Sequence, residues 1–75
     1  MAKLNTKIRY LCQDEDGGVH ASISSKPIIR HEEWLECDFY HIYNGKENQN
    51  WRDTLIDLDV DDYDFADGIL WRIEK

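Results

Sequence analysis

The sequence predicts a mainly β fold: a small antiparallel sheet of about four to five strands, with at most one or two short helical segments and α+β as the variant. Apolar and polar residues alternate near both ends of the chain, which is typical of strands with one buried face. The dipeptides Asp16-Gly17 and Asp67-Gly68 stand beside these alternating segments and favour tight hairpin turns. The 75 residues include 18 Leu, Ile, Val and Phe, which is enough for one core, so a single domain over residues 1–75 is expected.

The N-terminal part of the chain, residues 4–24, predicts a β-hairpin. With Asp16-Gly17 as a two-residue turn, Cys12 would pair with Ala21, and Tyr10 would pair with Ile23. These apolar side chains would then share one face of the hairpin. A register slip of one residue would place the partners on opposite faces, so hydrophobic parity favours this pairing.

The middle of the chain predicts four short segments. Residues 26–30 are expected to be extended, at a sheet edge, because a proline in a strand cannot donate to a ladder. Residues 31–37 favour one helical turn, and residues 38–43 favour a strand that Asn44-Gly45 closes. The polar residues 44–50 are expected to form a loop.

Two periodicities overlap between Trp51 and Val60. Trp51, Leu55 and Leu58 keep helical spacing, whereas Ile56, Leu58 and Val60 alternate with aspartates as in a strand. We expect a short helical turn near Trp51 followed by a strand, with a helix over the whole segment as the open alternative.

The C-terminal residues predict a second hairpin. A three-residue loop over residues 66–68 would pair Tyr63 with Trp71 and send Asp62 and Asp64 to the opposite face. A two-residue loop would instead pair Asp64 with Trp71 and mix acidic and core residues on one face. The longer loop is therefore the predicted one.

The net charge of −7 comes from one part of the chain. Residues 53–67, here called the acidic segment, contain no Lys or Arg, whereas the other residues carry nine acids and nine bases. The segment has seven aspartates: Asp53, Asp57, Asp59, Asp61, Asp62, Asp64 and Asp67. A protein of this charge is repelled by phosphate backbones and anionic lipid, so no direct binding of nucleic acid or membrane is expected.

The expected location is the cytoplasm. The N-terminal residues lack the apolar run of a signal peptide, and no window approaches the roughly 18 apolar residues that span a membrane. Cys12 and Cys37 are too few for a disulfide scaffold, and both are expected to be buried thiols.

A metal site is the first chemistry to consider for the acidic segment. Asp57, Asp59 and Asp61 have the spacing that opens a calcium-binding EF-hand loop. The sixth position of such a loop, normally glycine, is Asp62, and the twelfth, normally glutamate, is Gly68. No metal ligand is therefore assigned, and a divalent-metal site at these aspartates stays an alternative.

Zinc binding and catalysis have weaker sequence support. The three histidines and two cysteines form no Cys-x-x-Cys or His-x3-His pair. The chain has no Gly-rich phosphate loop, HExxH or GxSxG motif. We expect no enzymatic activity, no catalytic residue and no cofactor.

The remaining candidate is protein binding through the acidic segment. Aspartates at alternate strand positions would form a ridge of negative charge that imitates a phosphate backbone, and its natural partner is a basic protein. The predicted contact residues are Asp57, Asp59, Asp61, Asp62, Asp64 and Tyr63. The alternatives are a solvated face that only keeps the protein soluble, and a structural protein that forms a homodimer through its apolar sheet face.

Several short motifs together resemble the small acidic early proteins of tailed bacteriophages and prophages. They are Arg9-Tyr10, Asp16-Gly17, Lys26-Pro27, Trp34, Asn44-Gly45 and residues 67–73. The resemblance implies a protein that binds and disables host machinery in the host cytosol, in some cases as a DNA mimic. The expected partner is then a basic host protein.

Overall fold

The computed structural model describes residues 8–35 and 39–74, and within them the chain is built from short strands. The elements are β1 (Tyr10–Gln13), β2 (Gly18–Ser22), β3 (Ile28–Arg30), β4 (Glu33–Leu35), β5 (Tyr40–Asn44), the 3₁₀ turn η1 (Trp51–Asp53), β6 (Ile56–Asp57), β7 (Asp61–Ala66) and β8 (Ile69–Glu74). The described residues contain no α-helix. The predicted mainly β class is therefore confirmed. No helix in this part of the chain has the length and apolar character needed to cross a membrane.

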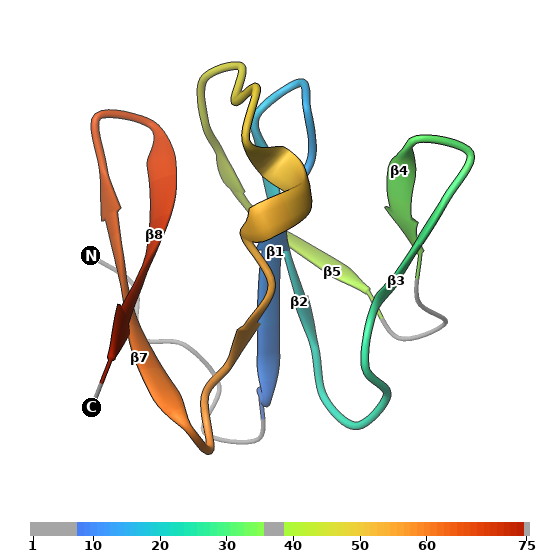
Figure 1. The fold of residues 1–75 in the computed structure, drawn as a ribbon, viewed down its shortest axis with the longest axis vertical. Helices are drawn as coiled ribbons and strands as arrows, with labels where there is room; N and C mark the ends of the chain where they lie inside the picture. The colour runs from blue at the N-terminus through green and yellow to red at the C-terminus, as the bar shows by residue number, and fades with distance from the viewer. Residues whose placement is uncertain (1–7, 36–38, 75) are drawn as a thin grey trace.

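Four strands form a central antiparallel sheet in the order β5-β2-β1-β6. The hairpins β3–β4 and β7–β8 are separate two-stranded sheets. Figure 1 shows β7–β8 on one side of the central strands and β3–β4 on the other. The sheet therefore lies between two hairpins that are not part of its hydrogen-bonded ladder.

Strand β1 is buried along its whole length. Leu11 belongs to one apolar cluster, with Val19, Ala21, Ile56 and Leu70. Cys12, its neighbour in the strand, belongs to a second cluster with Trp34 and Trp51. Because consecutive side chains of a strand point to opposite faces, both faces of β1 are covered, which is why Tyr10 to Cys12 is a continuous apolar run.

The first hairpin forms as predicted, but its predicted register is wrong by one residue. Leu11, not Cys12, pairs with Ala21, and Tyr10 pairs with Ser22. The turn has three residues because Gly17 adopts a φ of 101° and the Asp14 N–H donates to the Gly18 carbonyl. Residues 4–7 of the predicted first strand lie outside the described residues. The alternation of apolar and polar residues could not select the register, because β1 carries apolar side chains on both faces.

The middle segment confirms two predictions and corrects one. Residues 28–30 are extended as β3, and β5 lies where a strand was expected. The predicted helical turn over 31–37 is wrong, because β4 occupies 33–35 and pairs with β3. His31 and Glu32, with φ of 54° and 61°, form the connecting turn. Residues 36–38 lie outside the described part of the chain.

The predicted helical turn near Trp51 followed by a strand is confirmed by η1 and β6. The strand ends after two residues because the chain turns at residues 58–60, where the Val60 N–H donates to the Asp57 carbonyl at 2.9 Å. The pair Asp61-Asp62 lies after this turn, and Asp61 begins β7.

The C-terminal hairpin also forms, with a different loop from the predicted one. Asp67 and Gly68, with φ of 56° and 78°, make a two-residue turn that pairs Phe65 with Leu70 and Asp64 with Trp71. Both central residues of such a turn need positive φ, which Asp-Gly supplies. The prediction required Trp71 to be buried, and the structure leaves it 57% exposed.

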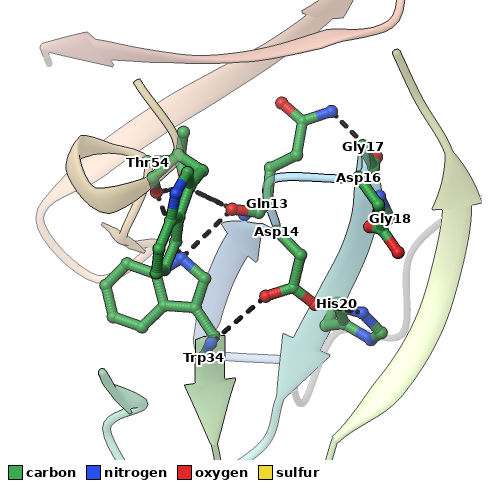
Figure 2. Close-up of polar contacts among 9 residues, drawn as sticks. Gln13, Asp14, Asp16, Gly17, Gly18, His20, Trp34 and Thr54 are labelled. Atoms are coloured by element: carbon green, nitrogen blue, oxygen red, sulfur yellow. Dashed lines mark hydrogen bonds and ion pairs between the residues drawn. The ribbon is translucent and has the colours of Figure 1, made fainter. Parts of the chain in front are cut away.

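The Gln13 side chain holds three loops together. Its Nε2 donates to the carbonyls of Gly17 and Gly68 at 2.9 and 2.8 Å, and its Oε1 accepts from Asn48 Nδ2 and the Leu70 N–H at 2.9 and 3.1 Å. The side chain is fully buried, and all four of its hydrogen-bonding positions are used. Figure 2 shows Gln13 reaching towards Gly17 from the end of β1. This residue ties the β7–β8 turn to the central sheet.

The three glycines of these loops meet backbone to backbone. The Gly45 N–H donates to the Gly17 carbonyl at 2.9 Å, and the Lys46 N–H donates to the Gly68 carbonyl at 2.8 Å. A Cβ placed on Gly45 would lie 2.4 Å from both Gln13 Nε2 and the Gly68 oxygen. Only glycine allows this approach.

Trp34 fixes the β3–β4 hairpin to the sheet. Its indole N–H donates to the carbonyls of Gln13 and Trp51, each at 3.1 Å. Its backbone N–H donates to Asp14 Oδ1 at 3.1 Å, and Asp14 Oδ2 lies 3.0 Å from His20 Nε2. Figure 2 shows Trp34, Asp14 and His20 in this arrangement.

Candidate binding surface

The aspartates of the acidic segment do not form one ridge. They lie on η1, β6, the following turn, β7 and the β7–β8 turn. Strand alternation then divides those of β7 between its two faces. The predicted contact residues must therefore be placed one group at a time.

Asp57 and Asp59 share one arginine. Arg9 Nε lies 3.3 Å from Asp57 Oδ1 and 3.2 Å from Asp59 Oδ2, and a second Arg9 nitrogen donates to Asp57 Oδ2 at 3.3 Å. The hydrogen bond from the Arg9 side chain is the main reason that the pKa of Asp57 is lowered. These two acids are separated from bases in the sequence but not in space.

Asp61 lies on the inner face of β7, where its carboxylate is 3.9 Å from Arg72 Nε. Both residues line an open cleft of about 520 Å³ between β7–β8 and η1. The charged side chains of this cleft are Lys26, Arg52, Arg72, Asp53, Asp57 and Asp61. Three bases therefore stand among three acids, and the cleft carries no excess of negative charge.

Asp62 and Asp64 lie on the other side of β7 and are exposed. Their partners across the hairpin are Ile73 and Trp71, which are also exposed, at 46% and 57%. Neither acid forms an ion pair with any residue in 8–35 or 39–74. We call these four side chains the outer face of the β7–β8 hairpin.

Tyr63 is separated from this outer face. It is half-buried, points to the inner side of β7 and packs against the apolar cluster that contains Leu11. Burial, and secondly the neighbouring Tyr43, raise the pKa of Tyr63 to about 12. Its phenol therefore stays protonated at neutral pH, and the structure does not bring it together with Asp62 and Asp64.

The described residues contain no group of three or more His, Cys, Asp or Glu side chains that could hold a metal ion. The three aspartates with EF-hand spacing lie on β6, a turn and β7, with two of them held by Arg9. Cys12 is fully buried, and desolvation raises the pKa of its thiol, which keeps it protonated and a poor nucleophile. Cys37 lies outside the described residues.

The pairing of Tyr63 with Trp71 predicted from the sequence places Trp71 on the buried face of the C-terminal hairpin. The structure places it on the exposed face beside Ile73. The signal that could have placed it there was the Asp67-Gly68 dipeptide, which favours the two-residue turn and hence the pairing of Asp64 with Trp71.

Comparisons with protein-family models, curated proteins and solved structures gave no significant match for this chain.

Proposed function

We propose that this protein is a non-enzymatic inhibitor that docks an acidic surface on a basic partner, one whose own surface binds nucleic acid. The observation that carries the proposal is the outer face, where two exposed acids lie directly opposite two exposed apolar side chains. An aromatic anchor next to uncompensated charge suits a partner surface that is basic and partly apolar. Because the sequence resembles phage early proteins, the expected target of such an inhibitor is a host protein.

The other predicted contact acids support the proposal less strongly. Asp57 and Asp59 share Arg9, and Asp61 faces Arg72, so much of their charge is compensated at short range. They add to the long-range field that steers a basic partner, an effect that salt screens. We therefore expect affinity to depend mainly on Asp62 and Asp64.

A matched pair of double variants tests this proposal. D62N/D64N and D57N/D59N each remove two negative charges, the first pair from the outer face and the second from the Arg9 ion pairs. We expect D62N/D64N to lose about tenfold or more in affinity for immobilised polylysine, and D57N/D59N to lose about threefold or less. The measurement is surface plasmon resonance at two salt concentrations. Equal losses for the two variants would contradict the assignment of the surface.

Identification of the natural partner needs affinity capture from a bacterial lysate followed by mass spectrometry. The proposal expects basic nucleic-acid-binding proteins that are enriched by the wild-type protein and depleted with D62N/D64N. Capture that the two double variants do not alter would argue against binding through acidic residues.

The homodimer alternative has less support than the inhibitor. It requires an apolar sheet face that is available to a second copy, and both faces of β1 in the central sheet are covered within the chain. The exposed apolar pairs, Ile28 with Leu35 and Trp71 with Ile73, lie on the two small hairpins, and each offers only a small apolar area to a second copy. The metal alternative also has less support, because Asp57, Asp59 and Asp61 do not form a cluster of three possible metal ligands within the described residues.

A further inference from the structure

The three tryptophans of this chain have different environments. Trp34 and Trp51 are 6% and 1% exposed, and their rings pack edge to face with centroids 6.2 Å apart. Trp71 is 57% exposed on the outer face, beside Ile73. An exposed tryptophan is costly in water, and tryptophan is enriched at the centres of interfaces. Trp71 is therefore the side chain of this face that a bound partner is expected to cover.

The charges around Trp71 indicate what would cover it. Asp64 is its direct partner across the hairpin, and Asp62 is the diagonal neighbour on the same face. Direct cross-strand side chains lie about 5 Å apart and diagonal ones about 7 Å. The face of an indole ring attracts a cation within about 6 Å, so one cation could contact the ring and the Asp64 carboxylate together.

The chain stacks its own arginines elsewhere. The guanidinium of Arg9 lies 5.1 Å from the centre of the Tyr10 ring, and that of Arg52 lies 4.5 Å from the Trp51 ring. Within the described residues no such cation lies over Trp71. Arg72, the adjacent base in β8, projects to the opposite face because successive side chains of a strand alternate.

From this geometry, and resting on the proposed function, we infer that Trp71, Asp64 and Asp62 form a recognition site for one arginine side chain of the basic partner. The planar guanidinium stacks on the indole and donates two parallel hydrogen bonds to Asp64, while Asp62 adds attraction from the diagonal position. The lysine ammonium group is a point charge and cannot donate two parallel hydrogen bonds to one carboxylate, so lysine binds less tightly at the same site.

The test uses peptides of six arginines, six lysines and six citrullines. Citrulline keeps the shape of arginine without its charge. Because Trp34 and Trp51 are buried, a change in tryptophan emission on titration reports Trp71. We expect a saturable change with the arginine peptide, binding several-fold weaker with lysine, and none with citrulline.

Calorimetry on variants separates this site from general attraction between opposite charges. D64N and W71A should each weaken the arginine peptide about tenfold, whereas D67N, in the turn of the same hairpin, should weaken it less than threefold. Asparagine tolerates the positive φ at position 67, so this control is not strained. Equal losses for D64N and D67N overturn the arginine site but leave the proposed acidic binding intact. Failure of the wild-type protein to bind either basic peptide overturns both.

Discussion

Replacing Gln13 by leucine is expected to remove about 4 kcal/mol or more from the free energy of unfolding, enough to unfold much of the protein. The substitution leaves the Asn48 side-chain amide and the Leu70 N–H without their acceptor. It also removes one of the two hydrogen bonds that each carbonyl of Gly17 and Gly68 accepts. Each buried polar group that loses its partner costs about 1–3 kcal/mol, and the total stability of a small domain is about 5–15 kcal/mol. Urea denaturation followed by tryptophan fluorescence measures the loss.

The matched control is Q49L, which changes an exposed glutamine next to Asn48. Its expected effect is within about 0.5 kcal/mol, as for other surface substitutions away from special features. If Q13L were as stable as Q49L, the loops would not depend on the Gln13 side chain.

Replacing Gly45 by alanine is expected to be destabilising by about 3 kcal/mol, or to prevent folding. The added methyl group would lie 2.4 Å from Gln13 Nε2 and from the Gly68 oxygen, and 2.6 Å from the Gly17 oxygen. Overpacking of this kind typically costs about 1–3 kcal/mol, and here the contacted atoms include backbone that cannot turn aside. Thermal denaturation by circular dichroism, with the soluble yield on expression, measures the effect.

Gly18 provides the comparison for Gly45. An added Cβ there would meet His20 Nε2 at 3.3 Å and Asp16 Oδ1 at 3.4 Å, both at the ends of side chains that can move. G18A should therefore change stability by less than about 1 kcal/mol. Equal stability of G45A and G18A would show that the three loops do not require the close approach of their backbones.

The sequence predicted the β class and the turns at Asp16-Gly17 and Asp67-Gly68, because alternation and Asp-Gly pairs are local signals. It did not predict the registers. Leu11 and Cys12 are both buried, on opposite faces of β1. The hydrophobic pattern of this strand therefore fits both registers of the first hairpin, the predicted one and the observed one. The register of the C-terminal hairpin was predicted wrongly because Trp71 was assigned to the core. A large aromatic residue is usually buried in a small domain, but here it lies on the surface.

The candidate surface was predicted in composition but not in arrangement. The acidic segment contains no base, but Arg9 lies 48 residues before Asp57 and folds against it. A pairing over that distance in sequence depends on how β1 and β6 assemble, which no local pattern contains. Among the predicted contact acids, the two that form no ion pair with another described residue are Asp62 and Asp64, which lie opposite Ile73 and Trp71.

The proposed contact surface for a basic partner is the outer face of the β7–β8 hairpin. It is tested most directly by recording two-dimensional ¹⁵N–¹H spectra while the arginine peptide is added. We expect the largest shifts at the backbone amides of Asp62, Asp64, Trp71 and Ile73 and at the Trp71 indole N–H. Shifts concentrated at Asp57 and Asp59, with the Trp71 signals unchanged, would contradict it.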